Sequence, residues 1–131
     1  MINDDLLELR KSLDTAFVDR MTDSNLALKP RFLSNNHLEG QKVLSVIDDE
    51  LSSCEEFSIS VAFITMGGIT PLLQTLRELQ RRGVKGRILT TDYLMFSEPE
   101  ALKKLSQFSN IELRMYRVQN GPGFHTKGYL F

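Results

Sequence analysis

Three segments rich in β-branched and aromatic residues alternate with two segments that have the periodicity of helices. The β-type segments are FSISVAFIT (57–65), GRILTTD (86–92) and IELRMYRV (111–118). Apolar residues recur every three or four positions in the segments between them, at 72–79 and 101–108. Strand–helix–strand units of this length connect parallel strands through right-handed crossovers. The sequence therefore predicts an α/β fold with a mainly parallel sheet.

The first β-type segment also predicts how the sheet is covered. Phe57, Ile59 and Val61 alternate along one face, yet Ala62 and Ile64 on the other face are apolar too. A strand that is apolar on both faces is typical of a central strand with helices on each side. We therefore expect helices on both faces of the sheet.

Capping residues predict where the two crossover helices begin and end. Thr70 is expected to cap the first helix, with Pro71 at the first helical position. Gly83 is expected to end that helix. Ser97 and Glu100, three positions apart, predict a capping box for the second helix.

Two further helices are expected before the α/β pattern. One spans 3–21, where apolar residues form a single stripe, and the other spans about 39–53. Turn-forming residues between them predict a connection. The predicted organisation is thus an N-terminal helix and connection at 1–37, followed by an α/β domain at 38–131.

Composition narrows the classes of function. The chain has 131 residues, with 16 basic and 17 acidic side chains and a net charge of -1. This balance argues against a protein whose whole surface binds nucleic acid, although it leaves room for a local basic cleft. A single cysteine, Cys54, excludes an internal disulfide and favours a cytoplasmic setting. No apolar run approaches membrane-spanning length, so we expect no membrane partner.

The last segment, FHTKGYLF (124–131), is expected to be a fourth strand that pairs antiparallel with the third. Residues two apart on a strand share a face, so His125 and Lys127 should project together, about 6 to 7 Å apart. An imidazole can attack phosphorus, and an ammonium group can neutralise a phosphate oxygen. The alternative is an edge strand with one polar face exposed to water.

Other residues could border such a site. Asp92 and Tyr93 end the second strand, at the edge where α/β proteins place their ligands, and are predicted to bind substrate together with Lys127. The basic run RELQRRGVKGR (77–87) is either the solvated end of a helix or a contact for a DNA backbone.

The segment FHTKGYLF resembles the first part of the His-x-Lys-x(4)-Asp (HKD) motif of the phospholipase D superfamily. Together with FSISVAFIT-GGI, RGVKGRILTTDYL and IELRMY, it is similar to the phospholipase D-like module at the N-terminus of certain bacterial superfamily 2 DEAD/DEAH-box helicases. The resemblance covers residues 38–131 and implies a phospholipase D-like βαβαββ half-domain. The motif's aspartate would fall at position 132, so we expect these residues to be the N-terminal part of a longer chain.

This resemblance implies a metal-independent nuclease or phosphodiesterase. His125 would be the nucleophile, or its acid partner, in a reaction through a phosphohistidine, and Lys127 would hold the phosphate. The family's following Gly-Ser-x-Asn segment is missing here. A working site needs two His-Lys pairs, from one chain or from a two-fold homodimer, so these residues alone are expected to be inactive or nearly so.

The resemblance also indicates partners and cofactors. DNA is favoured over RNA, no cofactor is expected for these residues, and ATP and Mg²⁺ are expected only for a helicase part outside them. The alternative hypothesis is a non-catalytic module with the same fold that binds nucleic acid or dimerises. The two hypotheses differ in the residue that function requires: catalysis requires His125, whereas binding of nucleic acid requires Lys127 and not His125.

Overall fold

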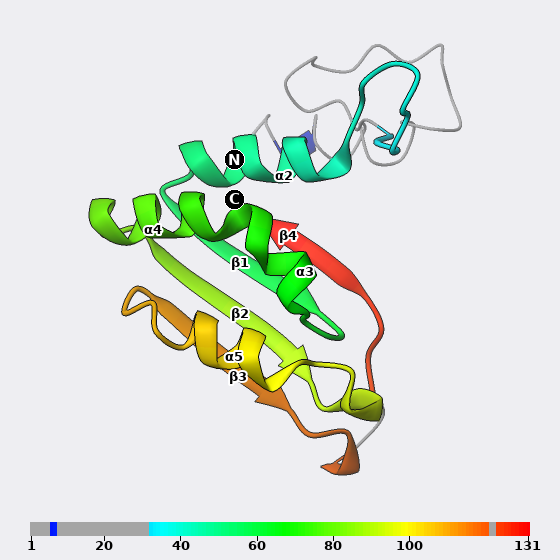
Figure 1. Cartoon of the computed structure of the whole chain (residues 1–131), viewed down its shortest axis with the longest axis vertical. Coiled ribbons are helices and arrows are strands. Elements are labelled where there is room, and N and C mark those ends of the chain that lie inside the picture. The colour runs from blue at the N-terminus through cyan, green and yellow to red at the C-terminus, as the bar shows by residue number, and fades with distance from the viewer. Residues whose placement is uncertain (1–5, 8–31, 121–122) are drawn as a thin grey trace. The chain divides into compact units, whose positions relative to one another are not determined.

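The computed structural model describes residues 6–7, 32–120 and 123–131 (Figure 1). The chain divides into two compact units, Met1–Val43 and Leu44–Phe131. The helix predicted at 3–21 lies outside the described residues except for Leu6 and Leu7, which are helical.

The described end of the first unit forms a small turn. The backbones of Asn36 and Gln41 exchange two hydrogen bonds, of 3.0 and 2.9 Å, and close residues 37–40 into a turn. The Asn36 side chain accepts hydrogen bonds from the amides of Leu38 and Glu39, as asparagine commonly does in turns. His37 is therefore a residue of this turn, and its position needs no functional explanation.

The second unit contains a four-stranded mixed sheet (Figure 1). Its strands are β1 (Glu56–Val61), β2 (Lys85–Thr91), β3 (Ile111–Tyr116) and β4 (Lys127–Leu130), in the spatial order β3-β2-β1-β4. β1, β2 and β3 are parallel, and β4 runs antiparallel to β1. The predicted α/β class and mainly parallel sheet are therefore confirmed.

The predicted partner of the last strand is wrong. β4 pairs with β1, with Ser58 opposite Leu130 and Val61 opposite Lys127, at the edge of the sheet away from β3. The physical reason is the length of the connection. Ten residues, 117–126, join β3 to β4. This length is enough to pass β2 and β1, since neighbouring strands lie about 4.8 Å apart, whereas a short hairpin turn joins only adjacent strands.

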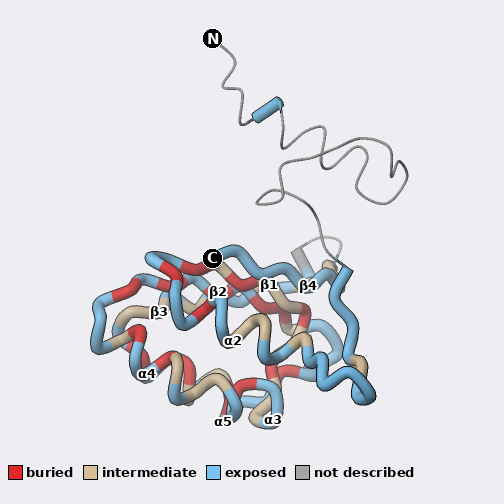
Figure 2. Tube along the Cα trace, turned by 90° about the horizontal axis from the view of Figure 1, so that it is seen from above, coloured by how far each residue is buried: buried red, intermediate tan, exposed pale blue. Residues whose placement is uncertain are grey.

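The helices of the second unit lie together on one face of the sheet (Figure 2). They are α2 (Val43–Ser53), α3 (Met66–Ile69), α4 (Leu73–Arg82) and α5 (Pro99–Leu105), with short 3₁₀ turns at Thr70–Leu72, Tyr93–Met95 and Val118–Asn120. Leu51, Leu76 and Leu105 from these helices pack against Ile59 and Ile88 of the sheet. This layer is the hydrophobic core.

The prediction of helices on both faces is wrong for the described residues. The face opposite the helices carries exposed or half-buried polar side chains, among them Ser58, Arg87 and Arg114. Ala62 and Ile64, which suggested a second apolar face, are buried but follow the end of β1 at Val61. They fill the end of the core and do not alternate along the strand.

The first crossover helix begins earlier than its expected cap. Thr65 caps α3 by accepting a hydrogen bond of 3.1 Å from the amide of Gly68, so Gly67 and Gly68 are helical and Thr70 lies inside the helical segment. Gly83 ends α4 with a left-handed φ of 74°, as predicted.

The second crossover helix also has a different start. Its N-cap residue is Glu98, and the Ser97 hydroxyl makes no cap. Instead, the buried Ser97 hydroxyl accepts a hydrogen bond of 3.2 Å from the amide of Ile64. It thereby ties the loop after β2 to the loop after β1.

Candidate functional site

The candidate site lies at the carboxyl ends of β1 and β2. Phe63 follows β1, and Tyr93 and Phe96 follow β2. Because β4 is antiparallel to β1, its first residue, Lys127, pairs with Val61 at this same edge. Parallel sheets bind their ligands outside the carboxyl ends of the strands.

The structure brings His125 and Lys127 together. The Lys127 Nζ lies 3.3 Å from the His125 Nδ1 and 3.2 Å from the His125 carbonyl oxygen. The strand predicted at 124–131 is shorter than expected: β4 begins at Lys127, and His125 lies just before it, so the pair meets at the start of the strand. Both residues are exposed and can reach a ligand.

This contact also indicates which nitrogen of the imidazole carries a proton. An ammonium group has only donors, so Nδ1 must accept in this contact, and a neutral His125 then carries its proton on Nε2. In that tautomer, the Nε2–H group can donate a hydrogen bond to a phosphate oxygen, whereas transfer of a proton to a leaving oxygen requires the imidazolium, which carries a proton on both nitrogens. Attack on phosphorus by Nε2 would first require that proton to leave.

Aromatic rings form a wall beside the pair. The ring centroid of His125 lies 6.0 Å from that of Phe63 and 6.2 Å from that of Tyr93. Phe96 completes the wall. Its ring centroid lies 5.8 Å from that of Phe63 and 6.4 Å from that of Tyr93, and both pairs are edge-to-face. The Lys127 Nζ lies 5.5 Å from the Phe63 ring centroid, which favours the cation by about 0.5–1 kcal/mol at an exposed site.

Hydrogen bonds fix the loop that carries Tyr93. The Asp92 carboxylate accepts a hydrogen bond of 2.8 Å from the amide of Val118. The Thr91 hydroxyl accepts from the amide of Tyr93 at 2.9 Å and donates to the carbonyl of Ala62 at 3.0 Å. Asp92 therefore lies at the predicted edge with one oxygen engaged by the backbone, while Tyr93 directly flanks His125.

The tip of this loop has an unusual backbone. Leu94 and Met95 have φ values of 48° and 55°, in the left-handed region. This conformation costs a residue with a side chain about 1–2 kcal/mol. Hydrogen bonds from Met95 to the Asp92 carbonyl and from Phe96 to the Tyr93 carbonyl, of 3.0 and 3.2 Å, hold the turn. Such strain is often found where a loop presents side chains for function.

The start of α3 is already occupied by side chains of the protein. The Glu98 carboxylate accepts a hydrogen bond of 2.7 Å from the amide of Met66, and Thr65 accepts from Gly68. A helix N-terminus can bind an anion when its amides are available. Here Glu98 takes the place that a phosphate would need.

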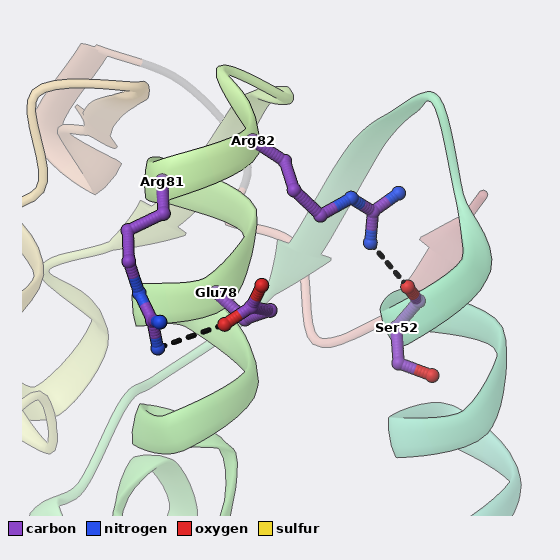
Figure 3. Close-up of polar contacts among 4 residues, drawn as sticks. All are labelled: Ser52, Glu78, Arg81 and Arg82. Carbon is purple, nitrogen blue, oxygen red and sulfur yellow. Dashed lines mark hydrogen bonds and ion pairs between the residues drawn. The ribbon is translucent and has the colours of Figure 1, made fainter.

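Much of the basic run at 77–87 has structural partners. Arg82 donates to the carbonyl of Ser52 at 2.5 Å, which joins α4 to the end of α2 (Figure 3). It also donates to the carbonyl of Cys54 at 3.2 Å. Arg81 pairs with Glu78 at 2.8 Å (Figure 3). These contacts favour the interpretation of residues 77–82 as a helix end, whereas Lys85 and Arg87 belong to β2.

Phe63 and Phe96 were not among the site residues predicted from the sequence. Phe63 belongs to an apolar segment that looked like a continuing strand, and Phe96 to the loop YLMF. The signal that could have revealed Phe96 was the loop itself, because Leu94, Met95 and Phe96 form an apolar run between a strand and a helix. All three are exposed, at 63%, 81% and 51%.

Neither a metal cluster nor a membrane span is present among the described residues. Within 6–7, 32–120 and 123–131, no three or more His, Cys, Asp or Glu side chains are grouped so that they could hold a metal ion. In the same part of the chain, none of the helices has the length and apolar character needed to cross a membrane.

No protein-family model matches the chain, and a search of curated proteins gives no match.

Proposed function

We propose that the second unit is a phospholipase D-like phosphodiesterase half-site, the N-terminal nuclease module of a larger DNA helicase or restriction-type protein. The observation that carries the proposal is the contact of 3.3 Å between the Lys127 ammonium and the His125 imidazole at the carboxyl edge of the sheet. A phosphate placed there would meet a cation and a proton-transferring group at once.

The reaction needs two histidines. One neutral imidazole attacks phosphorus and forms a P–N bond, while the P–O bond to the leaving strand breaks and the second histidine, as an imidazolium, protonates the leaving oxygen and becomes neutral. Water then attacks the phosphohistidine, the P–N bond breaks and frees the first imidazole, and the second imidazole takes the proton from that water and becomes an imidazolium again. In either role, His125 would face the phosphate through Nε2, because Lys127 lies against its Nδ1.

His125 is the one histidine of residues 44–131, so the second unit supplies half of this machinery. The other His-Lys pair would come from a second copy or from further chain. The geometry therefore supports weak activity of these residues that depends on association. The proposed site needs no cofactor of its own, and ATP and Mg²⁺ would serve a helicase part.

Diester hydrolysis at increasing protein concentration tests this proposal. With bis(p-nitrophenyl) phosphate in excess chelator, the rate should rise with the square of protein concentration, because two half-sites must meet. His125→Ala should abolish the rate. Equal hydrolysis by wild type and His125→Ala would refute the catalytic proposal, whereas hydrolysis by neither at any concentration would exclude a second copy as the source of the other His-Lys pair.

The second candidate is a non-catalytic nucleic-acid-binding or dimerisation module. It is favoured by the single histidine and by the exposed Lys127 beside it. For this function, binding of a DNA oligonucleotide should survive His125→Ala and weaken with Lys127→Ala, more so at low salt. Loss of binding on His125→Ala alone would argue against it.

A further inference from the structure

The aromatic loop beside the His-Lys pair is built differently from an ordinary surface loop. Tyr93 and Phe96 are 37% and 51% exposed, and their rings are held edge-to-face, 6.4 Å apart. Phe63 supports Phe96 from the side, also edge-to-face. Exposed rings in fixed orientations leave ring surface available to a ligand.

The ligand of these rings must be compatible with the neighbouring cation. Tyr93 touches the His125 ring, and Phe63 touches both His125 and the Lys127 ammonium. A molecule that reaches the rings and the pair together needs a flat apolar surface next to a negative charge. A nucleotide has this combination, because only the sugar separates its base from its phosphate.

We infer that the loop Tyr93–Phe96 is a stacking platform for a base of a single-stranded nucleic acid whose phosphate lies on Lys127 and His125. The inference rests on the proposed function, since it places the base of the same substrate. It adds strand selectivity: bases in a duplex are covered by their neighbours on both faces, whereas an unpaired base offers a free face to an aromatic ring.

The backbone of the loop supports this assignment. The left-handed residues Leu94 and Met95 are exposed, and their conformation turns the chain sharply between the two rings. Four hydrogen bonds hold the loop, two within it and two through Asp92 and Thr91. The rings are thus positioned before any ligand binds, which lowers the entropic cost of binding.

The test uses the 131-residue chain and a pentamer of deoxythymidylate, followed by NMR. Binding should shift the thymine base protons upfield, because ring currents act on a base that stacks. A pentamer of the same backbone with abasic sugars should bind more weakly. A blunt-ended duplex whose two strands are joined by a chemical linker, so that it has no unpaired bases, should also bind more weakly than the single strand.

Two matched variants separate stacking from general apolar contact. Phe96→Leu keeps an apolar side chain and removes the ring, and it should weaken binding of the pentamer by at least about fivefold, toward the low end of base–aromatic stacking. Phe131→Leu is the control: Phe131 is 43% exposed and lies beside Glu55 and Cys54, at the opposite end of the sheet. It should leave binding unchanged.

The outcomes distinguish this inference from the proposed function. If Lys127→Ala weakens binding of the pentamer and of the abasic strand while Phe96→Leu changes neither, the stacking platform is wrong and the phosphate half-site stands. Equal affinity for duplex and single strand would also overturn the platform. If neither Lys127→Ala nor Phe96→Leu alters binding, or no strand binds, both ideas fail.

Discussion

Gly86 of β2 offers a sharp test of how the core is packed. It pairs with Phe57 of the neighbouring strand, and the Phe57 ring lies across the space where a side chain would be. A Cβ atom at position 86 would lie 2.0 Å from the Phe57 Cζ and 2.4 Å from both Cε atoms. Phe57 is only 2% exposed, so its ring has little room to move.

Gly86→Ala should therefore destabilise the protein by about 3 kcal/mol, the upper end of the range for overpacked cores. Urea unfolding followed by circular dichroism measures this loss. Phe57→Leu alone should cost about 1–2 kcal/mol through lost burial. The double variant should be more stable than the sum of the two losses predicts, because a smaller side chain at position 57 makes room for the methyl group added at position 86.

A double-mutant cycle gives the coupling directly. We expect a favourable coupling of at least about 1 kcal/mol between the two substitutions, in the range found for residues in contact. Strictly additive losses, or a Gly86→Ala variant as stable as the wild type, would refute the proposed packing of the Phe57 ring over Gly86.

Single contacts elsewhere in the second unit give three more expected outcomes. Arg82→Ala should lower the unfolding free energy by about 1 kcal/mol, because two carbonyls at the end of α2 lose their donor. Arg81→Ala should change it by less than about 0.5 kcal/mol, because the ion pair of Arg81 with Glu78 is exposed. Equal losses of the two variants in urea unfolding would contradict this difference. Leu94→Gly should leave stability unchanged or raise it by up to about 1 kcal/mol, since glycine tolerates the left-handed conformation; a clear loss would show that the loop is not strained. Burial raises the pKa of the Cys54 thiol, so the folded protein keeps this proton at a pH where the unfolded chain loses it. Stability should thus fall as the pH rises past 9.0, and Cys54→Ala should reduce that fall; an unchanged slope in the variant would contradict the assignment.

Local signals predicted the order of the elements, because each depends on residues close in the chain. The stripe of Leu76 and Leu79 and the stop at Gly83 illustrate this, and both are present as expected. The partner of β4 depends on which sheet edge the chain reaches, and no local pattern encodes that choice. Likewise Ala62 and Ile64 are buried for a reason that becomes visible only when β1 is seen to end before them.

The candidate site was predicted in part for the same reason. His125 and Lys127 are two residues apart, so their proximity follows from the sequence alone, and Tyr93 follows from the rule that ligands bind at strand ends. Phe63 and Phe96 are far apart in the sequence and meet only because two loops fold over one edge. Their pairing is a tertiary fact that periodicity cannot reveal.

The most direct test of the account is whether His125 and Lys127 bind one phosphodiester together. In the 131-residue chain labelled with ¹⁵N, the His125 imidazole should show the tautomer protonated on Nε2. Addition of a thymidine dinucleotide should shift the His125 Nε2 and Lys127 Nζ resonances along a single saturation curve, and Lys127→Ala should abolish the shift of His125. A His125 resonance that ignores the dinucleotide, or that responds equally in Lys127→Ala, would contradict the proposed half-site.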